Sequence, residues 1–342
     1  MLRAHAKRQP DRLRGHARVG GCQGGAARLR REARAGLAGQ VANVSGSHDH
    51  PTGTPGDSRR ARRAGAAWML LAASCIAVVD GIVKYLTPTI NGVQVVWGYV
   101  GASLIFLLAV TLARGVSPVS LARTRRPFLQ LARGACLVCS LSALFISLRY
   151  LPLAVATTVS FTAPLIIAAL SGPILGERVG AKRWLAVLVG MVGASLVVRP
   201  GSEVFHWASL LTLLGAFFFA LFHLATRVLG AFDRPLTTVL YTFVVSTALV
   251  SLAMPFVWVA PTVSQWWLFA LTGLLGFTAH FSLARSLVLA DASAVAPLHY
   301  VRLLWAIGIG LAVFGHVPDA WTLAGGGLIV ASGVYVVGSG SR

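Results

Sequence analysis

The sequence predicts an all-α membrane protein, in which ten transmembrane helices form two inverted five-helix repeats with both termini in the cytoplasm. Composition is the first observation behind this fold class, since the 342-residue chain is 56% hydrophobic and only 12% charged, far more apolar than soluble domains. The second is a series of ten apolar runs, each close to the roughly 20 residues that cross a bilayer as a helix. The third is the shortness of the turn-rich joints between the runs.

The ten predicted spans follow one another closely along the chain. We place them at residues 66–86, 93–113, 128–148, 153–175, 183–199, 207–227, 236–257, 267–289, 293–314 and 321–338. Their orientation follows from Lys and Arg, which concentrate in cytoplasmic loops. With a cytoplasmic N-terminus, nine of these residues fall in inner loops and only Arg149 and Arg199 fall in outer loops. This distribution predicts that both ends of the chain lie inside.

Residues 1–65 form a basic stretch in front of the first span. They carry 14 of the 30 Lys and Arg residues against four acids, with much Gly and few aromatics. A segment of this kind cannot bury enough apolar surface to fold, so we expect a disordered tail. Contact with nucleic acid or anionic lipid is conceivable for a basic arm. A solvated extension is the simpler interpretation, and no nucleic-acid partner is expected.

A shift of 139 residues relates the two halves, 66–199 and 207–338, although few identities fall in register. The residues brought together by the shift include Trp68 and Trp207, Lys84 and His223, and Phe161 and Tyr300. Because five helices is an odd number, the second copy would enter the membrane upside down. Inverted repeats build a site near the midplane that opens to either side by rocking, which is the architecture of secondary transporters.

Four stretches carry a resemblance to a known family. They are DGIVKYL, QVVW, RYLPLAVATTVSFTAPLIIAALSGPILGERVGAKRW and ADASAVAPLHYVRLLWAIGIGLAVFGHVP, which belong to the first, second, fourth and ninth spans. In this order they resemble the EamA branch of the drug/metabolite transporter superfamily, over roughly residues 66–338. Within it the chain looks most like the proteobacterial subgroup that includes riboflavin and S-adenosylmethionine transporters. The resemblance implies a multi-pass protein of the bacterial inner membrane that carries a small organic metabolite.

Two positions depart from the pattern of that family. Its members commonly carry Arg two residues after the Trp of the second span, where this chain has Tyr99. The ninth span usually ends in Gly-Glu, and here it ends in Gly315-His316. If the missing Arg binds an anionic substrate in relatives, either the substrate differs here or another cation replaces it. Arg302 is the obvious replacement.

Charged groups at depth are the strongest functional signal, because ionisable residues inside a membrane are rare and usually functional. Asp80 and Lys84 lie four apart in CIAVVDGIVKYL, on one helix face. An unpaired Asp or Lys at the bilayer centre costs about 2.5–3.5 kcal/mol. The interface, mutual pairing or a polar cavity could each lower that cost. We expect the two side chains to pair, and we leave open whether the pair is structural or lines the translocation path.

Arg302 has no acid one turn away in its own helix, so it needs a partner from another helix, from water or from an anionic substrate. Asp80 is the only acid assigned to the hydrocarbon depth, so we predict a contact between Asp80 and Arg302. The alternative is an Arg302 that faces a water-filled vestibule. Asp80 could also belong alternately to Lys84 and to Arg302 during a transport cycle.

The remaining candidates are aromatic, imidazole and proline side chains in or beside the spans. The full predicted set for substrate binding or translocation is Asp80, Lys84, Trp97, Tyr99, His280, His299, Tyr300 and Arg302, with helix bends at Pro164 and Pro297. The aromatics would stack on a planar ligand or serve only in packing. The histidines would relay protons or pack as neutral rings, and the prolines would mark bends beside a cavity or packed kinks.

These residues predict a secondary transporter that moves a small organic metabolite, such as a riboflavin-like, amino-acid or S-adenosylmethionine-like compound, by alternating access. No GxxxxGK[ST] motif occurs, so ATP is not the driver, and proton or substrate gradients remain. We expect no cofactor, no metal site and no catalytic residue, while a homodimer stays open. The alternatives are an intramembrane enzyme, for which HExxH and GxSxG motifs are missing, and a membrane scaffold or sensor that uses the basic tail.

Overall fold

The computed structural model describes residues 55–115, 117, 122–175, 180–199, 205–229, 232–233, 235–289 and 296–338. The predicted tail, residues 1–65, lies outside this description up to residue 54. Every regular element in the described ranges is a helix, and none of these residues forms a strand. They belong to the unit His50–Arg342, which is described here by itself.

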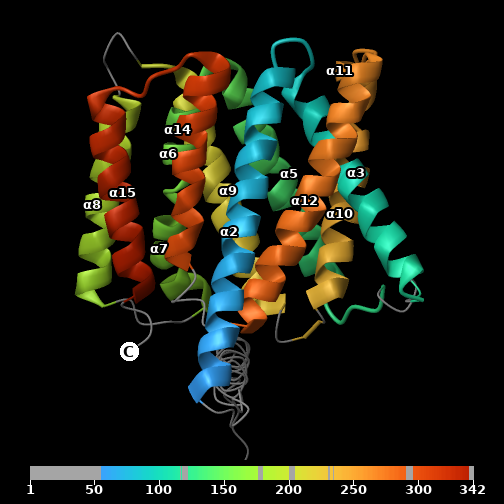
Figure 1. The fold of residues 1–342 in the computed structure, drawn as a ribbon, viewed down its shortest axis with the longest axis horizontal. Coiled ribbons are helices and arrows are strands. Elements are labelled where there is room, and N and C mark those ends of the chain that lie inside the picture. The colour runs from blue at the N-terminus through green and yellow to red at the C-terminus, as the bar shows by residue number, and fades with distance from the viewer. Residues whose placement is uncertain are drawn as a thin grey trace, which may run out of the picture. The chain divides into compact units, whose positions relative to one another are not determined.

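The helices follow the apolar runs of the sequence (Figure 1). Those of the first half are α2 (Pro55–Leu86), α3 (Gly92–Ala113), α5 (Pro127–Tyr150), α6 (Leu153–Ser160), α7 (Ala163–Leu175) and α8 (Ala181–Val198). Those of the second half are α9 (Trp207–Leu229), α10 (Pro235–Ser251), α11 (Met254–Val257), α12 (Val263–Leu289), the 3-10 helix η1 (Ala296–Tyr300), α14 (Val301–Phe314) and α15 (Ala320–Gly338).

Six segments of the described chain are helical over a length and with an apolar character sufficient to cross a membrane. They are Arg63–Leu86, Gly92–Ala113, Pro127–Tyr150, Leu153–Gly172, Trp207–Leu229 and Val263–Leu283. Four shorter apolar helices, Trp184–Val198, Leu236–Ser251, Leu298–Phe314 and Ala320–Tyr335, coincide with other predicted spans. The chain is therefore built as a multi-pass membrane protein, and its ten-helix arrangement and orientation stay predictions.

Several predicted spans are interrupted rather than continuous. The span at 153–175, apolar and largely helical over Leu153–Gly172, contains the turn Phe161–Thr162 between α6 and α7. Pro164 lies just beyond this turn and has no N–H to donate, so a continuous helix would lose a hydrogen bond there. The described start of the span at 293–314 is likewise a 3-10 turn, η1, which leads into α14. Discontinuous helices of this kind are typical of transporter sites.

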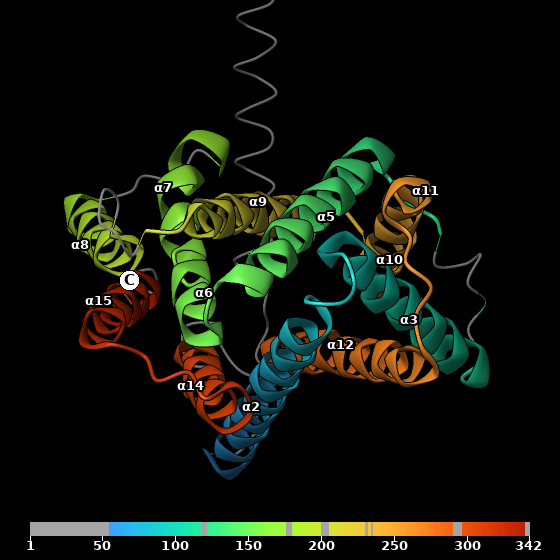
Figure 2. The ribbon, with the colours of Figure 1, turned by 90° about the horizontal axis from the view of Figure 1, so that it is seen from above.

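Helix pairs from the two halves pack side by side. Figure 2 shows α2 beside α12, α5 beside α9, and α3 beside α10, while α8 and α15 form a pair at one edge of the bundle, next to α6 and α7. The largest hydrophobic core joins α2, α3, α5, α10 and α12, where Phe145, Phe243 and Phe269 are fully buried. The two halves thus share one core, which places residues far apart in the sequence next to one another.

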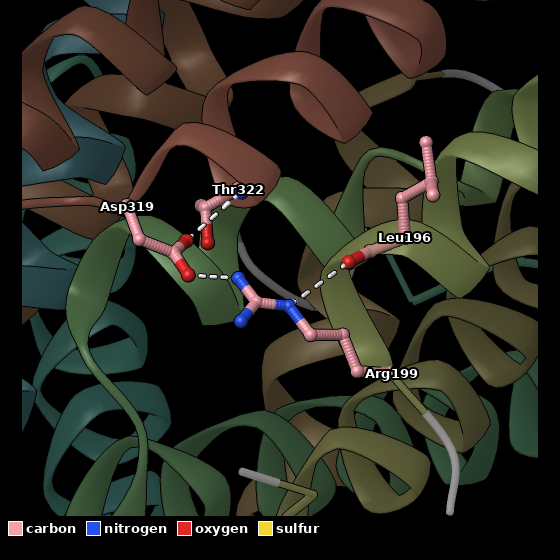
Figure 3. Close-up of polar contacts among 4 residues, drawn as sticks. All are labelled: Leu196, Arg199, Asp319 and Thr322. Carbon is pink, nitrogen blue, oxygen red and sulfur yellow. Dashed lines mark hydrogen bonds and ion pairs between the residues drawn. The ribbon is translucent and has the colours of Figure 1, made fainter. Parts of the chain in front are cut away.

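Glycine and an ion pair join α8 to α15. A Cβ added at Gly193 would lie 2.8 Å from the carbonyl oxygen of Gly325, so the two backbones touch. At the end of α8, Arg199 adopts a left-handed conformation (φ 48°) and donates to the carboxylate of Asp319 (Figure 3). The other carboxylate oxygen of Asp319 accepts from the backbone N–H of Thr322 at 2.9 Å, as a helix N-cap does. The ion pair therefore links the residue that ends α8 to the residue that caps the start of α15.

A polar cluster ties the two halves together at the end of the bundle where α5 begins, which we call the basic end because Arg123, Arg125 and Arg126 lie there. Asp233, between α9 and α10, accepts from Thr124 Oγ1 at 2.5 Å, from the backbone N–H of Arg125 at 3.1 Å and from Gln130 Nε2 at 2.9 Å. We call this cluster the Asp233 clasp. In the predicted orientation it faces the cytoplasm.

The Asp233 clasp predicts a pH dependence of stability. Burial alone would raise the pKa of the Asp233 carboxyl group, but hydrogen bonds from Thr124, Arg125 and Gln130 outweigh it and hold that pKa below its ordinary value. A carboxylate with a depressed folded-state pKa stabilises the fold above its unfolded pKa of about 3.9, and this contribution is lost as pH falls through the folded pKa. Because the group is largely solvated, we expect less than about 1 kcal/mol.

Thermal unfolding of the wild type and of Asp233→Asn between pH 7 and pH 3 measures this effect. The wild type should be the more stable at pH 7, and the difference should shrink as pH falls below about 4. Thr124→Val, which removes one donor and keeps the carboxylate, should lie between them. A difference that stays constant over the whole pH range would contradict the assignment.

Candidate functional site

A cavity of about 330 Å³ lies inside the bundle, lined by helices of both halves. Most of its lining is apolar, with a small set of polar side chains, which is the composition usual for small-molecule sites. The predicted residues that line it are Asp80, Tyr99, Pro164, His280, His299, Tyr300 and Arg302. Two predicted residues, Lys84 and Trp97, do not belong to the lining.

Asp80 and Arg302 form a buried ion pair on the wall of this cavity. Arg302 Nε donates to Asp80 Oδ2 at 2.8 Å, and Arg302 Nη2 lies 2.5 Å from the same oxygen. Asp80 is 3% exposed and Arg302 9% exposed. The pair joins α2 to α14 and so confirms the predicted contact between the two halves. Pairing neutralises two charges that would each be costly in a membrane interior.

The predicted pair between Lys84 and Asp80 is wrong, because Lys84 has other partners. Its Nζ donates to the carbonyl oxygens of Leu148 at 3.0 Å and Leu151 at 2.7 Å, and it lies 5.4 Å from the ring centroid of Phe314. Within the described chain, no ion pair links it to Asp80. The last carbonyls of a helix lack partners and carry partial negative charge. Lys84 therefore caps the C-terminal end of α5, while Arg302 takes the carboxylate.

Tyr99 and His280 extend the polar wall from α3 to α12. The hydroxyl of Tyr99 and Nε2 of His280 are 3.4 Å apart, a long hydrogen bond whose donor depends on the imidazole tautomer. The Tyr99 ring packs edge to face on Phe145 and against Gly276, where a Cβ would lie 2.4 Å from the ring. Tyr99 therefore presents a neutral hydroxyl group at the position where the family resemblance led us to expect an arginine.

Trp97 was expected in the pocket, but the structure places it in another cluster. Its indole Nε1 donates to Ser251 Oγ at 3.0 Å, and its ring meets Trp258 and Trp266 edge to face. Trp97 points away from Tyr99 because the two side chains are only two residues apart on a helix, roughly 200° around its axis. This tryptophan cluster fits the aromatic belt at a membrane interface.

The breaks in the fourth and ninth spans bring aromatic rings together at the cavity. Phe161, at the turn between α6 and α7, packs on Tyr300 with ring centroids 4.8 Å apart, and on His299 at 6.2 Å. The hydroxyl of Tyr300 is buried without a hydrogen-bond partner among the described residues. Pro164 follows the first break and lines the cavity. Pro297 lies in η1, and its side chain is outside the described part of the chain.

The structure also shows residues that the sequence analysis overlooked. The rings of Phe219 and Phe222 on α9 line the cavity beside His223. Arg133 on α5 is 5% exposed inside the third span. The signal for Arg133 was present, since it is a charge within the apolar run 128–148, the same criterion that singled out Arg302. The phenylalanines gave no such signal, because aromatic residues are common throughout membrane helices.

A multi-pass chain whose described elements are all helices, and which encloses a largely apolar cavity with a buried ion pair, has the organisation of a membrane transporter. The chain belongs to the EamA-like transporter family, whose model matches residues 63–199 and 206–338. Membership of this family makes it a transporter rather than an enzyme, and implies a small-molecule substrate.

Curated relatives with different cargoes are similar over most of the chain. A riboflavin transporter of Rhizobium johnstonii is 28% identical, over 80% of this chain and 90% of its own. An S-adenosylmethionine uptake transporter of Rickettsia bellii is 27% identical, over 82% and 96%. The pseudopaline exporter CntI of Pseudomonas aeruginosa is 29% identical, over 79% and 94%. One solved crystal structure, 18% identical, covers 80% of this chain and 95% of its own with a TM-score of 0.57, and shows the fold alone.

Proposed function

We propose that this chain is a secondary transporter that moves a small organic metabolite across the bacterial inner membrane by alternating access. The cavity around Asp80 and Arg302 is its substrate site. The observation that carries this proposal is the buried ion pair itself, since it joins α2 of the first half to α14 of the second on the cavity wall. A charged pair in a membrane interior marks a functional site by default.

The bounds of the helices support two inverted five-helix repeats, at 66–199 and 207–338. Shifted by 139 residues, the start of α8 at Ala181 falls on the start of α15 at Ala320, and the start of α7 at Ala163 falls one residue past the start of α14 at Val301. The same shift lays Phe161 on Tyr300, and these two residues touch. Contact between equivalent residues is expected close to a pseudo-two-fold axis, where transporters place their substrate.

Alternating access in this geometry requires contacts between the halves to exchange. At the basic end, the Asp233 clasp joins the segment before α5 to the segment before α10. At the opposite end, Gln94 exchanges two hydrogen bonds with the backbone of Val259, at 2.7 and 2.9 Å. Opening toward either side would break the contacts at that end. The Asp80–Arg302 pair lies between them, where a polar cargo competes for either partner.

The cavity supports a cargo that combines a planar ring with polar groups. Phe161, Tyr300, Phe219 and Phe222 offer ring faces and edges, and Asp80 with Arg302 offers one acceptor and one donor. Riboflavin-like and S-adenosylmethionine-like compounds have this character, and amino acids share its polar part. A proton gradient is the proposed coupling, with His280 and His299 as candidate relays, and a homodimer is a further proposal.

Uptake into proteoliposomes tests this function. Purified full-length protein is reconstituted, and entry of radiolabelled riboflavin, S-adenosylmethionine and a mixture of amino acids is followed with and without an imposed pH gradient. We expect accumulation of one of these classes above that in protein-free liposomes. A chain that lacks residues 1–54 should transport equally well, whereas a tail-dependent sensor would lose its function. Absence of uptake for every class, under every gradient, would contradict the proposal.

A further inference from the structure

Arg133 on α5 is a buried cation without a carboxylate partner. Its Nε donates to Thr226 Oγ1 at 2.6 Å, and its Nη1 donates to the carbonyl oxygen of Thr238 at 3.0 Å and to Thr242 Oγ1. Nη2 makes no hydrogen bond to any residue in the described part of the chain, and no acid there lies within ion-pair distance of the guanidinium. The positive charge is therefore held in place but not neutralised.

The two other deep cations of the described chain are compensated. Arg302 has Asp80, and Lys84 has the partly negative carbonyl end of α5. Arg133 lies about 9 Å from the start of the same helix, at the end whose partial charge is positive. The hydroxyl groups of Thr226 and Thr242 donate to backbone carbonyls of their own helices, so they present lone pairs to Arg133. These neutral partners orient the guanidinium group without cancelling its charge.

Arg133 packs on an aromatic ring of a residue that lines the cavity. Cζ of Arg133 lies 4.2 Å from the ring centroid of Phe222, and this ring belongs to the cavity lining. Leu137, one turn beyond Arg133 on α5, also belongs to the lining. Thr226, which holds Nε, lies one turn beyond Phe222 on α9. Arg133 therefore lies directly behind the Phe222 ring, between the cavity and the basic end.

An acceptor without a hydrogen-bond partner, Gln130 Oε1, lies on the same helix as the unpartnered donor, Arg133 Nη2. Gln130 lies one turn before Arg133 on the same face of α5. Its Nε2 is oriented by the carboxylate of Asp233, and its Oε1 is buried with no partner in the described ranges. The unpartnered NH2 group of Nη2 and one unpartnered oxygen on the same helix face complement an anion that also carries a hydroxyl group.

We propose that Arg133 is an anion-binding residue on the transport path, and that the cargo carries a carboxylate or phosphate group which reaches Nη2 when the Phe222 side chain turns aside. This inference rests on the proposed transport function and narrows its substrate class. S-adenosylmethionine and amino acids carry a carboxylate. Riboflavin has neither group, whereas its 5′-phosphate, flavin mononucleotide, does.

Binding to the purified full-length protein in detergent tests the inference with pairs of compounds that differ in the anionic group. The pairs are flavin mononucleotide against riboflavin, and S-adenosylmethionine against 5′-methylthioadenosine, measured by isothermal titration calorimetry at constant ionic strength. Inorganic phosphate alone is a further probe. We expect the wild type to prefer the anionic member of at least one pair by about 10- to 100-fold, the range of one charge-assisted hydrogen bond.

Arg133→Gln should abolish this preference and leave the affinity for the neutral member unchanged. The variant should fold, because no acid loses its partner, and thermal unfolding checks this. Arg133→Lys, which keeps the charge and loses the planar fork, should retain an intermediate preference. Arg123→Gln removes the same charge from an exposed position at the basic end and should behave as the wild type.

Two results would overturn the inference: no anion preference in the wild type for any pair, or a preference that survives in Arg133→Gln. If the first result is found but inorganic phosphate binds, and Arg133→Gln abolishes that binding, Arg133 is a small-ion site and the assignment of the cargo is overturned. Uptake distinguishes this failure from failure of the transport function. Transport of the neutral compounds alone contradicts only the anion site. Arg133-dependent anion binding without any uptake contradicts the transport function, and leaves Arg133 as an anion-binding residue outside a transport path.

Discussion

Asp80→Ala is expected to lower the free energy of unfolding by about 3–5 kcal/mol and to abolish uptake. The substitution leaves Arg302, which is 9% exposed, without its carboxylate partner in the interior of the bundle. Breaking a buried pair by removal of one partner is costly because the remaining charge stays desolvated. Arg302→Ala should have the same direction. Chemical unfolding of the purified protein in detergent measures the first effect, and proteoliposome uptake measures the second.

The double variant Asp80→Asn, Arg302→Gln separates stability from transport. Replacing both charges leaves no uncompensated ion, so we expect most of the lost stability to return. Uptake should stay absent, because the cavity has lost the charged donor and acceptor that the cargo requires. A double variant that transports at the wild-type rate would show that the pair is only structural. A single Asp80→Ala variant as stable as the wild type would contradict the buried pair itself.

Gly325→Ala is expected to destabilise the protein by about 1–3 kcal/mol, the usual cost of an overpacked contact. A Cβ at this position would lie 2.5 Å from the carbonyl oxygen of Gly193 and 2.6 Å from Val197 Cγ2. The first of these atoms belongs to the backbone of α8, so no side-chain rotation relieves the clash. The two helices would have to separate. Small residues at helix contacts permit such close approach in membranes.

Gly327→Ala is the matched control for this prediction. It lies two residues further along the same helix, α15, and a Cβ there meets no atom within 4 Å. Alanine is the better helix former by up to about 1 kcal/mol, so this variant should be as stable as the wild type or slightly more so. Thermal unfolding of both variants in the same detergent decides the matter. Equal destabilisation would indicate a general effect of glycine replacement rather than a contact between α8 and α15.

The positions of the helices could be predicted because the bilayer restricts what the backbone can do. A segment in lipid must satisfy its own hydrogen bonds, so apolar runs of sufficient length form helices whatever lies beside them. The runs that contain Gly92–Ala113 and Trp207–Leu229 illustrate this. The exact shape of a helix could not be predicted where proline interrupts its backbone hydrogen bonds, as at the turn Phe161–Thr162. A kinked helix and a broken helix share one sequence pattern.

Some features of the candidate site could likewise be predicted from the sequence, and others could not. The contact between Asp80 and Arg302 followed from the sequence, since only one acid was assigned to the depth of the membrane. The place of Trp97 did not follow, because the direction of a side chain around a helix matters only once the neighbouring helices are known. The charge of Arg133 could have been noticed in the sequence by the criterion that identified Arg302. Its lack of a carboxylate partner could not, because that depends on α9 and α10, which are distant in the sequence.

The sequence by itself determined that this chain is a helical membrane protein of a transporter family, with charges placed where lipid alone would not accept them. Only the tertiary structure decided which groups pair with those charges. Lys84, one turn from Asp80, caps the carbonyls of α5 instead, while Arg302 reaches Asp80 from 222 residues away. The physical reason is that a desolvated charge needs a partner within about 3 Å. Helix packing, and not separation along the chain, determines which groups come that close.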